Sequence, residues 1–143
     1  RILIHHCLWI SEELMLALPA SHPAVSSFEK HGVDLSLLRD EPFILNQQNS
    51  YFRSLEREIL SHCSFTPDVL CEIRDLNASS NMVANGKGIA FLPRSVYDHA
   101  EGCHLFSLPE PMIFHVVIAY SKGIILTGPI RDLIMLLLKN APQ

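Results

Sequence analysis

Two stretches of the chain decide its fold, LRDEPFIL at residues 38–45 and MVANGKGIAFLP at residues 82–93. In the first, Pro42 disfavours the α conformation at the residue before it, so a short helical turn ends there and a buried strand over 43–45 follows. In the second, Gly86 can adopt the left-handed conformation that ends a helix, and a short apolar strand over 89–92 follows. Each stretch therefore joins a helical segment to a buried strand.

The rest of the chain repeats this alternation. We expect further strands at residues 2–4, 14–18, 69–73, 103–108 and 113–120, helices that begin near Phe52 and at Asp75 or Asn77, and a loop over 21–32. Asp34 can cap a turn over 35–38, and Pro129 can open a last helix over 130–140. Strands that alternate with helices predict an α/β domain with a largely parallel sheet.

Composition limits the classes of function. The 143 residues are 48% hydrophobic and 18% charged, enough for one domain, or for one and a fraction of a two-lobed protein. The net charge of −4 is spread out without a basic cluster, so this chain alone should not bind DNA. Four cysteines without a CxxC pair indicate reduced thiols in a cytoplasmic protein. No signal peptide and no membrane span are expected.

The last expected helix is unusual because it has almost no polar face. Its apolar residues run from Ile130 to Leu138 nearly without interruption. A helix of this kind is covered on all sides in a folded protein. We therefore expect either a lobe missing from this chain or a second copy of the chain to cover it, and we expect self-association.

Three phrases together resemble the effector-binding domain of LysR-type transcriptional regulators. They are LPASHP at 18–23, DLSLLRDEPFI at 34–44, which is similar to the family's DLxxxPFI segment, and GKGIAFLP at 86–93, which is similar to its GxGIAxLP segment. The resemblance extends from about Glu13 to Leu138. It implies a fold like that of type II periplasmic binding proteins, in which two α/β lobes are joined by two crossing strands and a small molecule binds between them.

By this resemblance, residues 1–19 are a crossover strand and a remnant of lobe I, residues 20–115 are lobe II, and residues 116–143 are the return strand and the C-terminal helix of lobe I. The implied function is effector sensing in a cytoplasmic bacterial regulator, without catalysis. The full regulators contact DNA through an N-terminal winged helix-turn-helix domain, which is absent from this chain. The alternative is a stand-alone solute-binding or enzymatic domain of the same fold.

The best candidate site is the polar loop over residues 46–50. It leaves the C-terminal end of a strand and enters a helix, the place where open α/β sheets bind ligands. The helix N-terminus favours a carboxylate or other anion, and Gln47, Asn49, Ser50 and Tyr51 add uncharged donors and acceptors. Asn49 or Ser50 can also serve simply as the N-cap of the helix, and the two roles are compatible.

Asn77 lies at a second strand-to-helix junction, where a capping role is nearly as well supported as ligand contact. His5, His6 and Cys7 are adjacent and have no second ligand cluster, so we expect no metal site. No nucleophile-elbow motif or other catalytic phrase occurs, and no cofactor is expected. Gly86 and Gly88 lack the full G-x-G-x-x-G pattern and precede a strand, so we interpret them as structural.

Overall fold

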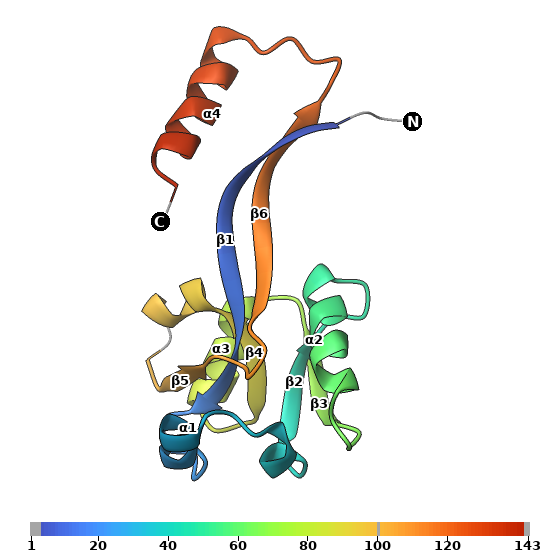
Figure 1. Ribbon diagram of the computed structural model, residues 1–143, viewed down its shortest axis with the longest axis vertical. Coiled ribbons are helices and arrows are strands. Elements are labelled where there is room, and N and C mark those ends of the chain that lie inside the picture. The colour runs from blue at the N-terminus through green and yellow to red at the C-terminus, as the bar shows by residue number, and fades with distance from the viewer. Residues whose placement is uncertain (1–3, 100, 142–143) are drawn as a thin grey trace. The chain divides into compact units, whose positions relative to one another are not determined.

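The computed structural model describes residues 4–99 and 101–141. The chain forms two compact units, one made of residues 1–12 and 113–143 and the other of residues 13–112. It passes from one unit to the other twice, within strand β1 (Ile4–Pro19) and within strand β6 (Met112–Ser121), and these two strands pair with each other (Figure 1). No helix in the described ranges is long and apolar enough to cross a membrane.

Strand β1 corrects one prediction. We expected two short strands at 2–4 and 14–18, but residues 4–19 form one continuous strand, and residues 1–3 lie outside the described part. The polar segment that suggested an interruption is accommodated by strand pairing, because Ser11 Oγ lies 2.9 Å from His115 Nδ1 of β6. A polar side chain satisfied across a strand pair does not end the strand.

Residues 13–112 form a sheet in the order β3-β2-β4-β1-β5. Its other strands are β2 (Pro42–Asn46), β3 (Asp68–Ile73), β4 (Ile89–Pro93) and β5 (Cys103–Phe106). Strand β2 runs parallel to β3 and β4, whereas β1 runs antiparallel to β4 and β5. The prediction of a largely parallel sheet is confirmed for β2, β3 and β4, but the antiparallel pairs of β1 make the sheet as a whole mixed. Strand β1 runs against β2 although α1 lies between them in the chain, so a helix between two strands did not imply a parallel pair here.

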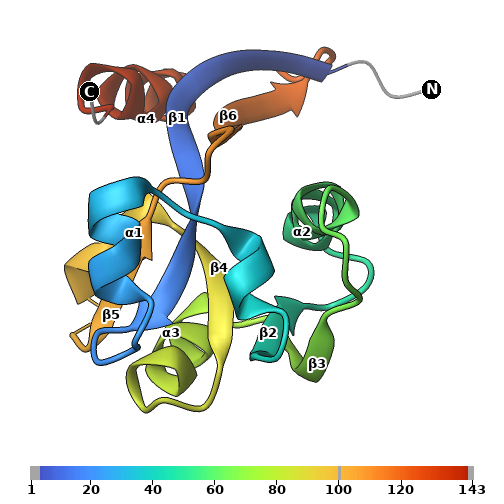
Figure 2. The ribbon, with the colours of Figure 1, turned by 60° about the horizontal axis from the view of Figure 1, so that its bottom comes forward.

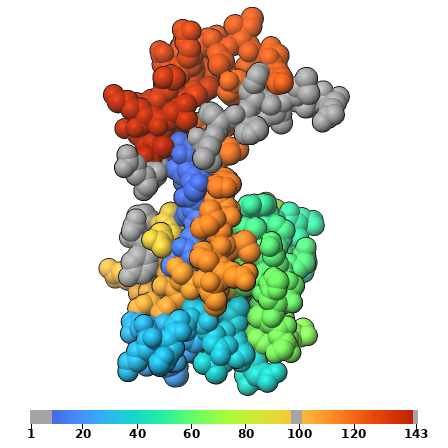
Figure 3. Space-filling model, in the orientation of Figure 1, coloured from blue at the N-terminus to red at the C-terminus, as the bar shows by residue number. Residues whose placement is uncertain are grey.

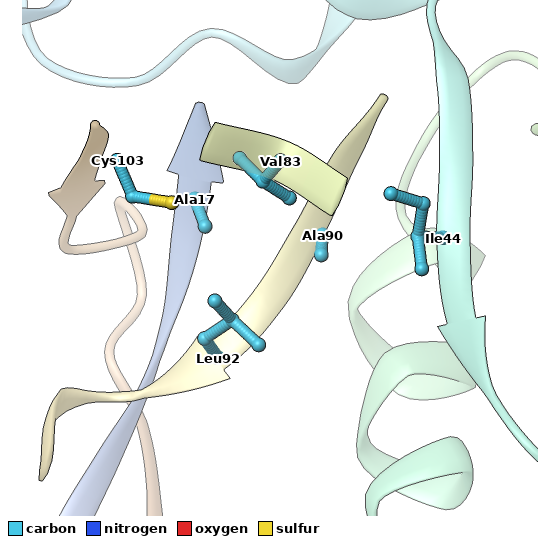
Figure 4. Packing of buried hydrophobic residues seen from close by; sticks show 6 residues of the cluster. All are labelled: Ala17, Ile44, Val83, Ala90, Leu92 and Cys103. Carbon is cyan, nitrogen blue, oxygen red and sulfur yellow. The ribbon is translucent and has the colours of Figure 1, made fainter. Parts of the chain in front are cut away.

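Apolar side chains cover both faces of this sheet. Val83 of α3 (Leu76–Ala84) lies near Ala17 and Ala90 of the two central strands (Figure 4). On the opposite face, Phe28 of α1 (Val25–His31) meets Phe106 edge-on, with ring centroids 5.7 Å apart. Figure 2 shows α1 and α3 on opposite sides of the sheet. The α3-side cluster consists of Ala17, Ile44, Val83, Ala90, Leu92 and Cys103.

The segment before β2 contains one element that we did not predict and one that we did. Helix α1 lies within the loop expected over 21–32; it has no side-chain cap and ends at Gly32, whose φ is +80°. The helix has only seven residues, so its apolar side chains do not repeat often enough to reveal a helical period in the sequence. The capped turn is confirmed as the 3₁₀ helix η1 (Leu35–Leu38), where the Asp34 carboxylate accepts from Ser36 N at 3.0 Å.

The turn between α3 and β4 confirms the roles predicted for both glycines. Gly86, with φ +69°, donates to Val83 O at 2.9 Å, and Lys87 N donates to Met82 O at 3.0 Å, which together form a Schellman motif. Gly88 is buried against β2, because a Cβ added there would lie 2.6 Å from Pro42 O. The first glycine supplies a backbone conformation, and the second permits a close approach of two chain segments.

Strand β3 lies at one end of the sheet and is irregular. Its pairing with β2 runs from Phe43 opposite Val69 to Ile44 opposite Cys71, so Leu70 has no counterpart. This arrangement is a β-bulge. The side chains of Val69 and Leu70 are 38% and 50% exposed.

The unit made of residues 1–12 and 113–143 contains the outer parts of β1 and β6 and helix α4 (Gly128–Lys139), which begins after Thr127 without a side-chain cap. No α4 residue is buried in the part of the chain that the structure describes, and the helix lies at the surface (red in Figure 3). One specific contact to this helix is the hydrogen bond from Trp9 Nε1 to Leu137 O, 3.0 Å. The exposed apolar residues of α4 are Ile130, Leu133, Met135, Leu136 and Leu138.

Candidate functional site

An open hollow of about 600 Å³ lies where β2 and β3 end and α2 (Tyr51–Ser61) begins. Because the two strands are parallel, their carboxyl ends meet at the same edge of the sheet, where ligands bind in open α/β folds. The loop and the start of α2 lie at the surface (Figure 3). The hollow is lined by Gln47, Gln48, Asn49, Ser50, Glu72 and Arg74.

Ser50 fixes the start of α2. Its Oγ accepts a hydrogen bond from Arg53 N at 3.0 Å, and its own backbone N–H donates to Gln47 O at 2.9 Å, which closes a turn. Ser50 is therefore the N-cap, with the extended conformation that this position requires. The positive end of the α2 dipole points toward the hollow that Ser50 lines.

A buried carboxylate anchors the loop at Asn46. We expected Asn46 in the polar loop, but it is the last residue of β2 and is buried, because Glu56 of α2 satisfies its polar groups. Asn46 N donates to Glu56 Oε2 at 2.9 Å, and Asn46 Nδ2 donates to Oε1 at 2.6 Å. Burial raises the pKa of Glu56, and the hydrogen bonds from Asn46 oppose that rise.

Arg53 connects the loop to β3. Its NH1 group donates to Asn46 O at 3.0 Å and lies 3.3 Å from Glu72 Oε1. Gln48 Nε2 donates to the same Glu72 oxygen at 2.6 Å. The loop is thus held by α2 on one side and by β3 on the other.

Arg74, directly after β3, contributes an exposed positive charge to the hollow, and its Nε donates to Gln47 Oε1 at 3.2 Å. Amide groups, one cap hydroxyl, one guanidinium and a helix N-terminus suit the binding of a small polar anion. No cluster of three or more His, Cys, Asp or Glu side chains that could hold a metal occurs within the described residues. The side chains of His5, His6 and Cys7 lie outside them.

The structure brings together three of the five residues expected at the site. Gln47, Asn49 and Ser50 line the hollow. Tyr51, the first residue of α2, does not line it and is 60% exposed. Asn77 is the second residue of α3 and does not line it either. Ligand contact at all five residues stays a prediction.

Asp75 is the N-cap residue of α3. Its Oδ1 accepts from the backbone N–H groups of Asn77 and Ala78, at 2.8 and 3.3 Å. Asn77 is therefore a recipient of the cap and does not supply it. Its exposed side chain takes no part in fixing the helix start.

Sequence reasoning missed two lining residues, Glu72 and Arg74, and it did not single out Gln48, although this residue lies within the loop predicted as the site. Glu72 pairs with Leu45 across the parallel ladder, which places the end of β3 beside the loop that follows β2. Glu72 and Arg74 alternate with the half-buried Cys71 and Ile73, a period-two pattern that was visible in the sequence. What the sequence did not show was that β3 is the neighbour of β2.

The LysR substrate binding domain family model matches residues 2–142. The chain belongs to this family. Similar regulators are the transcriptional dual regulator GltC of Bacillus subtilis, 28% identical over 104 residues, and the HTH-type transcriptional regulator BenM of Acinetobacter baylyi, 31% identical over 100 residues. These matches cover 73% and 68% of the LysR chain but 33% and 31% of the two regulators, so the chain matches about a third of their length.

Solved structures show the same fold. The Synechocystis PCC6803 CcmR regulatory domain, in complex with 2-PG, matches with a TM-score of 0.83 at 18% identity, covering 100% of this chain and 69% of that one. The BenM effector binding domain with its effector benzoate matches with a TM-score of 0.71 at 26% identity, covering 95% and 62%. The LysR chain thus has the fold of type II periplasmic binding proteins, as predicted, and its relatives are transcriptional regulators.

Proposed function

We propose that this LysR domain senses a small polar anion, which binds at the N-terminus of α2 against the loop over residues 46–50. The observation that carries the proposal is the hollow lined by Gln47, Asn49, Ser50 and Arg74 at the carboxyl ends of two parallel strands. The ligand of one relative supports the choice of an anion, because benzoate, the effector of BenM, is a carboxylate.

The proposed role is binding without catalysis. The cap hydroxyl of Ser50 accepts from the α2 backbone and is held there as a structural group. The charged side chains of the hollow are paired with amides or with Arg53, an arrangement that orients a ligand. The family match also favours a regulator over a stand-alone solute-binding protein or enzyme.

We further propose how the domain works in its regulator. Residues 20–115 are lobe II, residues 1–19 and 116–143 belong to lobe I and the crossing strands, and the effector biases the equilibrium between conformations of the two lobes. The regulator acts in the cytoplasm, self-associates, and contacts DNA through a separate helix-turn-helix domain. The apolar surface of α4 is the part of this chain best suited to such association.

An NMR titration with single small carboxylates, benzoate among them, tests the binding site. We expect the backbone amides of residues 47–50 to shift first, and we expect Arg74→Gln to weaken binding about threefold to fivefold, since an exposed charge contributes modestly. Arg39→Gln is the matched control, because Arg39 is an exposed arginine outside the hollow.

Two results of these titrations would contradict the proposed effector site or the role of Arg74 in it. If every acid that binds shifts amides elsewhere and leaves those of residues 46–51 unchanged, the effector site is not at this loop. Equal losses of affinity in Arg74→Gln and Arg39→Gln would show that only the overall charge of the domain matters.

A further inference from the structure

The charges around the hollow nearly cancel. Arg74 and Glu72 line it with opposite signs. Arg53 beneath is paired with Glu72 at 3.3 Å, and Glu56, fully buried behind Asn46, adds a negative charge under the loop. The exposed Arg57 donates from NH2 to Gln48 Oε1, at 3.4 Å. The attraction for an anion therefore comes from Arg74 and the α2 N-terminus, which matches one negative charge on a ligand.

Glu72 is the group that a second negative charge would meet. Its side chain is 34% exposed and remains open to the hollow, although Arg53 and Gln48 hold it. Both of their interactions go to one oxygen, Oε1. The carboxylate is thus held in position through that oxygen, while the residue still lines the hollow.

We propose that Glu72 is a specificity-determining residue that restricts the hollow to effectors with a single negative charge and neutral polar groups. This inference rests on the proposed effector site. A ligand with one carboxylate at the α2 N-terminus leaves the rest of the hollow to uncharged groups, which the amides of Gln47, Gln48 and Asn49 can bind. A dicarboxylate places its second charge near a fixed carboxylate, and like charges at close range repel strongly when partly shielded from water.

Glu72→Gln tests the negative charge of Glu72 separately from the interactions that position its side chain. Glutamine keeps the oxygen that accepts from Arg53 and Gln48, so the two interactions that position the side chain can persist while the negative charge is lost. Glu58→Gln is the matched control, because Glu58 is exposed on α2 and does not line the hollow. Thermal unfolding of each variant checks that the fold is retained, and Glu72→Asp, which keeps the charge, serves as a second test of specificity.

The probes are two pairs of nearly equal shape, succinate with succinamate and terephthalate with 4-carbamoylbenzoate, titrated by NMR at residues 47–50. We expect each monoamide to bind the unmodified chain on the order of tenfold more tightly than its dicarboxylate. Glu72→Gln should remove most of that difference by improving the dicarboxylate, whereas Glu58→Gln and Glu72→Asp should preserve it.

The outcomes separate this inference from the proposed function. If the dicarboxylates bind the unmodified chain at least as tightly as the monoamides, or if Glu72→Gln leaves a tenfold preference unchanged, the role of Glu72 is wrong while the effector site stands. If none of the four probes, nor benzoate, shifts residues 47–50, the effector site itself fails and the inference falls with it.

Discussion

Replacing Gly88 with alanine should destabilise the unit formed by residues 13–112 through a steric clash. A Cβ there would lie 2.6 Å from Pro42 O and 3.2 Å from Ile44 Cδ1. The Ile44 side chain can move, but Pro42 O is backbone next to Phe43, which pairs with Ile89 in the β2–β4 ladder. Relieving the clash therefore requires a shift of that ladder. Overpacking of this kind costs about 1–3 kcal/mol.

Two neighbouring substitutions separate the clash from other effects. A Cβ added at residue 86 would meet no atom within 4 Å, but the alanine would have to adopt a φ of +69°. Gly86→Ala should therefore lower the unfolding free energy by about 1 kcal/mol through backbone strain alone. Lys87→Ala, at an exposed position, should change stability by less than about 0.5 kcal/mol.

Urea unfolding followed by circular dichroism measures all three variants under one set of conditions. A loss of about 2 kcal/mol in Gly88→Ala corresponds to a fall in melting temperature of roughly 10 °C for a unit of this size. If Gly88→Ala unfolds at the same urea concentration as Lys87→Ala, β4 does not approach β2 as closely as described.

Three further predictions follow from other contacts. Burial raises the pKa of Glu56 above 4.5, so between pH 4.5 and the raised value the folded chain keeps a proton that the unfolded chain releases. The unfolding free energy of the native chain relative to Glu56→Gln should therefore increase as the pH falls through that window toward 4.5. Urea titrations near neutral pH and near pH 4.5 measure this difference in unfolding free energy, and a difference that does not change with pH would contradict the prediction. Leu133→Lys with Leu136→Lys should reduce self-association in analytical ultracentrifugation by removing apolar surface from α4, and an unmodified chain that is monomeric at tens of micromolar would refute the proposed interface. Trp9, the single tryptophan, should report on the α4 contact, so truncation after residue 127 should shift its fluorescence emission to the red; an unchanged spectrum would show that the bond to Leu137 O does not protect the indole.

Local signals in the sequence predicted the elements well where one residue determines the backbone. Asp34 and Gly86 stand at the positions expected of a cap and a helix end, because each acts through neighbours only a few residues away. The strand at 43–45 was found for the same reason, since Pro42 marks its start. Helix α1 was missed because two spaced apolar residues over seven positions are too few to show a helical period.

Features that depend on pairing between distant segments were not predictable from periodicity. The direction of β1 in the sheet depends on its insertion between β4 and β5, about 75 to 90 residues further along the chain. The same limitation applies to the site. Gln47, Asn49 and Ser50 were found because they follow a strand, whereas Glu72 and Arg74 lie in the hollow because β3 is adjacent to β2.

The bulge at Leu70 also bears on how the chain behaves when it is concentrated. A regular strand at the end of a sheet offers a repeating set of backbone groups to a strand of another molecule, and exposed apolar side chains such as Val69 would strengthen that contact. The extra residue breaks the repeat in the middle of β3. This edge is therefore a poor template for fibril growth, and its apolar side chains can remain exposed without leading to open-ended polymerisation.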